Sequence, residues 1–110
     1  MNQALTYTSY LKINELLSLQ EPQSDGPEHD ELLFIIIHQS YELWFKELKH
    51  ELYALARSLE SGDTSRSVGL LNRIRTILKV AVAQVDILET MTPLQFNSFR
   101  NRLESSSGFQ

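Results

Sequence analysis

Residues 30–60 read DELLFIIIHQSYELWFKELKHELYALARSLE, with apolar side chains recurring at alternating steps of four and three. From the first phenylalanine this spacing selects eight positions, seven of them hydrophobic: Phe34, His38, Tyr41, Phe45, Leu48, Leu52, Leu55 and Leu59. The repeat predicts a long helix whose stripe packs against a partner. His38 is its one strongly polar member, and a buried ring nitrogen without a partner costs about 1–3 kcal/mol. We therefore expect His38 to have a hydrogen-bonding partner.

The long helix is predicted to open with Asp30 as its N-cap and to close at Gly62, because glycine accepts a left-handed backbone. A second long helix is predicted from Thr64 or Ser65 to about Thr90. Its expected stripe is Leu71, Ile74, Leu78, Ala81, Val85 and Leu88. The two stripes should pack together as an antiparallel hairpin, with Ser61 to Asp63 as the turn.

Shorter elements flank this hairpin. The apolar spacing predicts a helix over about Tyr7 to Leu19, followed by a proline- and glycine-containing loop at 20–30, which is the only candidate linker. The sequence Thr-Pro-Leu-Gln at 92–95 predicts a capped start for a fourth helix that ends near Leu103. Since no segment alternates every two residues as a strand does, the chain is predicted to be all-α.

Composition narrows the function classes. A chain of 110 residues with 42% hydrophobic residues fits one domain or part of one. The net charge of −4, with basic residues interleaved among acids, argues against binding to nucleic acid or an anionic membrane. The absence of cysteine excludes disulfides and thiolate metal sites. The longest apolar run, Leu32 to Ile37, is far too short for a membrane span, so a soluble, cytoplasmic protein is expected.

The start of the long helix is apolar on several faces. Apolar residues outside the predicted stripe fill the other sides of this region: Leu32, Leu33, Ile35, Ile36, Ile37, Leu43 and Trp44. A surface helix has one apolar face, so these turns should be buried all round. We expect more protein to cover them, from another chain or from a further segment.

Two pairs of residues could carry chemistry. Phe34 and His38 stand four residues apart, as do Phe96 and Arg100, so each pair places an aromatic wall beside a polar or charged group on one helix face. Brought together, the four would suit a planar, amphipathic anion. The alternative is ordinary core aromatics, a satisfied histidine and a surface arginine, and spacing alone favours that alternative.

A metal site is the weaker interpretation. Glu47 and His50 have the Glu-x-x-His spacing of di-iron bundles, but no second motif accompanies them. His38 and Glu42 provide only two ligands. The serines at 105–107 have no neighbouring base and are typical of a flexible turn, so nucleophilic catalysis is not supported.

Several segments, in order along nearly the whole chain, resemble the amino-terminal part of the tryptophan 2,3-dioxygenase family. They are Leu5-Thr6-Tyr7-Thr8-Ser9-Tyr10-Leu11, His29 through Gln39, Glu42-Leu43-Trp44-Phe45-Lys46, and Leu88 through Pro93 to Phe99-Arg100 and Ser107-Gly108-Phe109-Gln110. The resemblance implies an all-α, haem-dependent homotetramer. Members of this family cleave the indole ring of L-tryptophan with O₂ to give N-formylkynurenine.

The resemblance implies roles for the residues that spacing singled out. His38 would be the distal, catalytic histidine that hydrogen-bonds the indole nitrogen. Phe34 and Phe96 would pack on the indole, and Arg100 would bind the substrate carboxylate as a charge-assisted pair.

The resemblance also implies roles for residues near both ends of the sequence. Tyr7, Tyr10 and Leu11 match a segment that reaches into a neighbouring subunit's pocket. Ser107 and Gly108 match a loop beside the haem and the substrate.

The haem iron ligand is expected outside this chain. In the family the proximal histidine lies beyond the last residue here, and His29 and His50 lie on or beside the same helix as His38. The chain alone is therefore expected to be inactive. The alternative function is a non-catalytic helical oligomerisation module that retains the family motifs.

Overall fold

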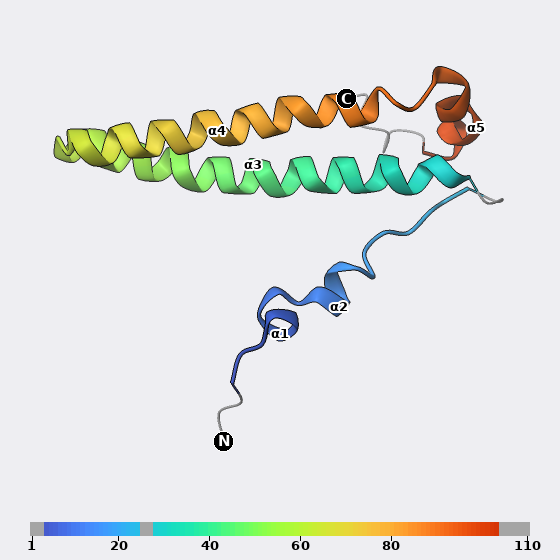
Figure 1. Cartoon of the computed structure of the whole chain (residues 1–110), viewed down its shortest axis with the longest axis horizontal. Helices are drawn as coiled ribbons and strands as arrows, with labels where there is room; N and C mark the ends of the chain where they lie inside the picture. Colours follow the sequence, from blue (N-terminus) through green and yellow to red (C-terminus); the bar gives the residue numbers. More distant parts are fainter. Residues whose placement is uncertain (1–3, 25–27, 104–110) are drawn as a thin grey trace.

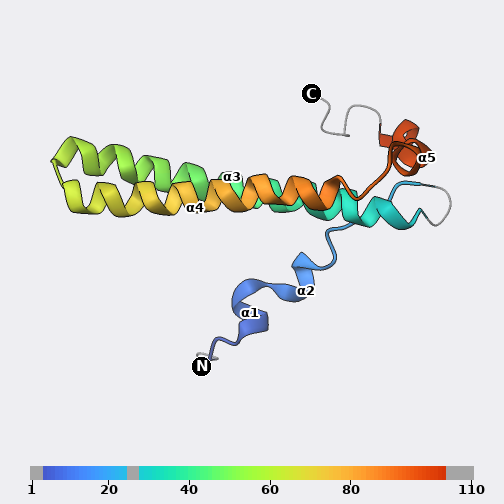
Figure 2. The ribbon, with the colours of Figure 1, turned by 45° about the horizontal axis from the view of Figure 1, so that its top comes forward.

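The chain folds as a long helical hairpin with short helices at both ends. The computed structural model describes residues 4–24 and 28–103, and none of these lies in a strand. The helices are α1 (Tyr7–Leu11), α2 (Ile13–Leu16), α3 (His29–Ser61), α4 (Thr64–Leu88) and α5 (Pro93–Leu103). α3 and α4 run antiparallel side by side, α5 lies at the open end beside the start of α3, and α1 and α2 form an arm away from the hairpin (Figures 1 and 2). The predicted all-α hairpin is confirmed.

The closed end of the hairpin is fixed by local signals. Gly62 has φ 75° and ψ 17°, a left-handed conformation that glycine adopts without the steric cost of a Cβ. Asp63 caps α4, since its carboxylate accepts a 3.0 Å hydrogen bond from the backbone N–H of Arg66. The predicted turn at 61–63 is confirmed.

The other predicted helix starts are partly corrected. α3 begins at His29 with Glu28 as its N-cap, so Asp30 lies in the first turn instead of capping it. A carboxylate there still favours the helix, because it faces the positive end of the helix dipole. α5 begins as predicted: the N–H of Thr92 donates to Gln95 Oε1 at 2.7 Å, and the N–H of Gln95 donates to Thr92 Oγ1 at 3.2 Å.

The amino-terminal helix is broken where a continuous helix was predicted. Lys12 has φ 54° and ψ 47°, a left-handed conformation that a right-handed helix cannot continue. The result is two short helices, α1 and α2, with no helical residue between Leu16 and Glu28 among those described. A capping box between Thr6 and Ser9 opens the first of them.

The stripe of α3 that meets α4 is turned by one residue from the predicted stripe. Its buried and half-buried members alternate at steps of four and three along the helix: Ile37, Tyr41, Trp44, Leu48, Glu51, Leu55 and Ser58; Phe34, one step earlier, packs against α5 instead. Phe45, Leu52 and Leu59, which were predicted to face the partner, are 46%, 50% and 62% exposed. This part of the sequence prediction is wrong.

α4 shows the same one-residue rotation. Its buried residues are Ser67, Leu70, Ile74, Ile77 and Ala81. Leu71, Leu78 and Val85 of the predicted stripe are exposed, whereas Ile74 and Ala81 are buried as predicted.

Polar pairs between the helices explain the rotation. The buried Glu51 accepts a 3.1 Å hydrogen bond from the guanidinium of Arg73, and the hydroxyls of Ser58 and Ser67 lie 2.8 Å apart. Each buried polar group thus has a partner, which removes the cost of burying it.

No helix in the described ranges is long and apolar enough to cross a bilayer.

A fully buried carboxylate anchors the loop that precedes α3. Glu31 is 0% exposed, and its oxygens accept hydrogen bonds from the N–H of Gln23 at 2.7 Å, the N–H of Ser24 at 3.1 Å and the hydroxyl of Ser24. Burial acts to raise the pKa of Glu31, but these hydrogen bonds outweigh it and hold the pKa below the ordinary value of 4.5. The loop is therefore fixed to the first turn of α3 by a charged group.

Candidate functional site

His38 lies on the third turn of α3 and is half-buried. Its Nδ1 is 2.7 Å from the backbone carbonyl oxygen of Phe34, one turn earlier. Because a carbonyl oxygen can only accept, Nδ1 donates this hydrogen bond. In the neutral imidazole the proton is therefore on Nδ1, and Nε2 is a hydrogen-bond acceptor. The partner expected for His38 is a backbone group of its own helix.

Three phenylalanine rings join His38 to α5. The centroid of Phe34 lies 4.3 Å from that of His38 and 5.4 Å from that of Phe96, which stacks on it at 28°. Phe99 contacts Phe34 and Phe96 edge-on, at 5.8 and 5.5 Å. The guanidinium carbon of Arg100 lies 6.0 Å from the Phe96 centroid, within cation–π range. The structure thus brings together the two residue pairs that spacing singled out.

Phe34 and Phe96 do not form the two separate aromatic walls of the predicted site. Phe34 and Phe96 stack on one another, whereas a planar ligand between two rings needs them roughly 7 Å apart, twice the usual carbon contact distance. Phe34 is 8% exposed and belongs to a small core cluster with Phe99, Met91 and Phe96. Any flat ligand must therefore lie beside this ring pair.

His38 also lines a groove between the amino-terminal arm and α3. The groove has a volume of about 460 Å³. Its lining is mainly apolar and consists of Leu16, Leu19, His38, Gln39, Glu42, Leu43 and Lys46. Gln39 binds the segment that follows α2: its Oε1 accepts from Gln20 Nε2 at 2.8 Å, and its Nε2 donates to the carbonyl of Leu19 at 3.0 Å.

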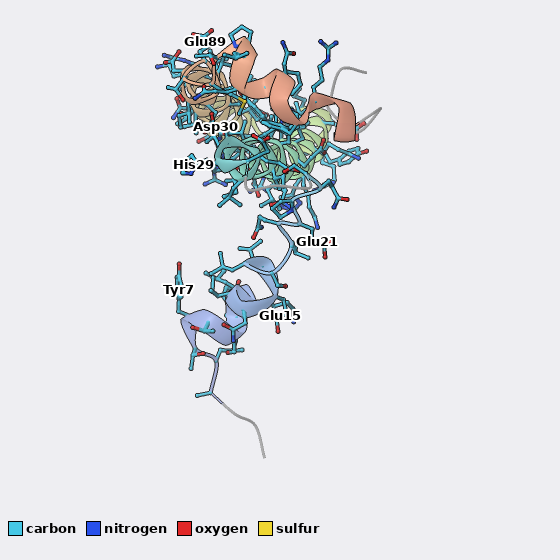
Figure 3. All side chains as sticks on the ribbon, turned by 90° about the vertical axis from the view of Figure 1, so that its right-hand side faces the viewer. Tyr7, Glu15, Glu21, His29, Asp30 and Glu89 are labelled. Carbon is cyan, nitrogen blue, oxygen red and sulfur yellow. The ribbon has the colours of Figure 1, made fainter. Side chains whose placement is uncertain are left out.

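The remaining predicted site residues are not beside His38. Tyr7, Tyr10 and Leu11 lie on α1, are exposed, and belong to the arm that stands away from the hairpin, as the position of Tyr7 in Figure 3 illustrates. Ser107 and Gly108 lie outside the described residues.

The described residues do not form a metal centre. His29 and His50 are exposed, and no group of three or more histidine, aspartate or glutamate side chains comes together in the described ranges. The Glu47 and His50 pair has no second motif beside it, so the di-iron interpretation gains no support.

Sequence reasoning missed two residues that shape the surroundings of His38. Glu31 fixes the loop before α3 from a position seven residues before His38, on the same helix face, and Gln39 binds the segment after α2 beside the groove. The only sequence signal for Glu31 is its place seven residues, about two helical turns, before His38. Nothing in the sequence distinguishes Gln39.

Comparisons with known proteins agree on one family. A family model described as "Tryptophan 2,3-dioxygenase" matches residues 1–110. The chain is 67% identical over its full length to a tryptophan 2,3-dioxygenase of Herpetosiphon aurantiacus, of which it covers 42%. It is 58% identical to that of an Anaeromyxobacter species, with 97% of this chain and 40% of the relative covered, and 47% identical to that of Dictyostelium discoideum, with 94% and 28% covered. The chain thus spans about two fifths of the length of the first two relatives.

Proposed function

Because the chain belongs to the tryptophan 2,3-dioxygenase family, we propose that it supplies the distal side of a pocket that binds L-tryptophan for cleavage by O₂. The reaction adds both oxygen atoms of O₂ across the indole C2–C3 bond and gives N-formylkynurenine. The residues that we assign to this pocket are His38, Phe34, Phe96 and Arg100.

The hydrogen bond made by His38 is the observation that carries this proposal. The indole N–H can only donate, so the residue that recognises it must accept. The bond from Nδ1 to the Phe34 carbonyl leaves Nε2 of the neutral ring as that acceptor and limits rotation of the imidazole. His38 would thus orient the substrate through one defined atom, and orientation is a large part of what a protein contributes when a cofactor carries the chemistry.

Arg100 and the two phenylalanines would complete the recognition. The guanidinium, positioned against Phe96, would bind the substrate carboxylate, and a two-pronged pair of this kind distinguishes an amino acid from free indole. Since Phe34 and Phe96 contact one another, the indole would pack beside this ring pair and next to His38.

Haem is the cofactor implied by the family, and it would bind and activate O₂. The described residues fit the substrate side of such a pocket but not the iron-ligand side, because His38 is assigned to the indole and His29 and His50 are exposed on the same helix. We therefore place the iron ligand outside these residues. Ser107 and Gly108 would lie beside the haem.

The amino-terminal arm would serve a neighbouring subunit. Tyr7, Tyr10 and Leu11 are exposed on α1, which contacts only α2 among the described helices. Apolar side chains on such an arm would be covered if it reached the pocket of another copy in a homo-oligomer, which the family resemblance implies is a tetramer.

The test compares L-tryptophan with 1-methyl-L-tryptophan, in which a methyl group replaces the indole N–H hydrogen. We expect the chain to bind L-tryptophan about five- to tenfold more tightly in ligand-observed NMR titrations, because one hydrogen bond is worth about 1 kcal/mol. His38→Ala should remove this difference. His50→Ala, an exposed histidine of the same helix, should preserve it.

A different result would favour the second candidate function, a non-catalytic helical interaction module. The exposed apolar residues Phe45, Leu52 and Leu59 are the observation in favour of that candidate. If His38→Ala leaves both ligand binding and the free energy of unfolding unchanged, the pocket assignment loses its basis. That result would support the interaction-module interpretation.

A further inference from the structure

An apolar stripe on the outside of the hairpin lies apart from the ring cluster. We call it the outer stripe; it consists of Phe45, Leu52 and Leu59 on α3 and Leu71, Leu78 and Val85 on α4. These are the residues that the one-residue rotation of both helices leaves outside the interface. They are 39–62% exposed. Large contiguous apolar surface of this kind marks an interaction site.

The two halves of the outer stripe lie on the same side of the hairpin. One surface groove is lined from both helices, by Leu59 of α3 and by Val68 and Leu71 of α4. A second groove continues along α4 and is lined by Leu71, Ile74, Arg75, Leu78, Lys79 and Val82. A helix lying along this side would therefore contact α3 and α4 together, as in a helical bundle.

The outer stripe carries positive charge at its middle. Lys49 lies between Phe45 and Leu52 on α3, and Arg75 lies between Leu71 and Leu78 on α4. Ser58 of α3 pairs with Ser67 of α4, and Glu51 pairs with Arg73. Counting along the two antiparallel helices from these pairs places the two cations at the same height along the hairpin, to within one residue. Neither takes part in the one ion pair found among the described residues.

We propose that the outer stripe is a docking surface for an amphipathic α-helix that carries carboxylates opposite Lys49 and Arg75. Apolar side chains of this helix would cover the leucines, and its acidic side chains would pair with the two cations at the rims. The relatives are more than twice as long as this chain, which leaves room for such a helix within the same polypeptide.

A second copy of this chain fits the surface less well. A two-fold axis that buries the whole stripe passes through its middle, and it places Lys49 and Arg75 of one copy against those of the other. Like charges opposed in this way cost energy, whereas an acidic helix turns the same cations into favourable contacts.

The probes are two designed helical peptides of about three heptads, identical in their leucines and differing only in whether glutamate or lysine flanks them. Fluorescence anisotropy at low salt should show about tenfold tighter binding of the glutamate peptide to the chain, and this ratio should shrink as salt is raised. Lys49→Glu with Arg75→Glu should reverse the preference. Arg57→Glu, an exposed position of α3 outside the outer stripe, is the matched control and should not.

Leu52→Asp and Leu78→Asp test the apolar part of the surface. Both side chains are about half exposed, so these variants should keep their helical circular dichroism while losing at least about tenfold in affinity for either peptide. The proposal is overturned if the two peptides bind equally, if neither binds, or if the preference survives the double charge reversal. Sedimentation that shows the chain pairing with itself through Leu52 and Leu78 overturns it in favour of a second copy.

Discussion

Replacing Phe99 with alanine is expected to lower the free energy of unfolding by about 3–5 kcal/mol and to detach α5 from the hairpin. Phe99 is 1% exposed and packs edge-on against Phe34 and Phe96. With Met91 these rings form the cluster that joins α5 to the start of α3. Truncation leaves a cavity at the centre of this small cluster, and little other packing compensates for it.

Urea denaturation gives the loss of stability, and amide hydrogen exchange locates it. We expect the amides of α5 to lose protection in Phe99→Ala while those at the closed end of the hairpin, around the Ser58 and Ser67 pair, change less. Leu94→Ala is the control on the same helix, because Leu94 is 80% exposed and should matter little. Unchanged protection of α5 in Phe99→Ala would contradict the assigned packing.

Phe99→Ala also tests whether the proposed pocket needs Arg100 in its present position and not only its presence in the chain. Arg100 follows Phe99 directly, so detaching α5 also removes the guanidinium from the neighbourhood of His38. Binding of L-tryptophan should then weaken although both His38 and Arg100 are still present. Phe99 would act as a positioning residue, through the helix that presents Arg100.

Local signals in the sequence predicted the turn at the closed end of the hairpin and the start of α5. The left-handed Gly62 and the capping box of Thr92 and Gln95 depend on residues within a few positions of one another, so a sequence pattern contains them. The break at Lys12 has no such signal, because lysine does not favour a left-handed backbone. The continuous helix predicted there was wrong for this reason.

Periodicity predicted the hairpin but not which side of each helix faces inward. Phe34, Tyr41, Leu48 and Leu55 recur every seven residues and belong to both possible stripes. Hydrophobicity alone favours completing them with Phe45, Leu52 and Leu59. The structure instead completes them with Ile37, Trp44, Glu51 and Ser58, because Arg73 and Ser67 on α4 satisfy the two polar groups. That choice depends on the facing helix, which a pattern along one helix does not contain.

The candidate site, like the hairpin, could be predicted from the sequence only in part. The spacing of Phe34 with His38 and of Phe96 with Arg100 predicted which residues share a helix face, and the ring contacts bring the two pairs together. The direct stacking of Phe34 on Phe96 depends on how α5 crosses α3, which spacing does not determine. Their roles in binding tryptophan stay a prediction.

Glu31→Gln should destabilise the chain by about 1–3 kcal/mol at neutral pH, because the two backbone N–H groups and the hydroxyl that serve the carboxylate would meet an amide with a single acceptor oxygen. The difference in the free energy of unfolding between the parent chain and Glu31→Gln should depend on pH in a defined direction.

The pKa of Glu31 in the folded chain lies below its ordinary value of 4.5. The stabilisation that the carboxylate provides is therefore complete above about pH 4.5 and is lost as the pH falls through the folded pKa. Urea denaturation between pH 7 and pH 3 should therefore show the parent chain and Glu31→Gln converging in acid, whereas Glu21→Gln, an exposed residue of the same loop, should follow the parent. A constant gap between the parent and Glu31→Gln across this range would mean that Glu31 acts through its shape and not through its charge.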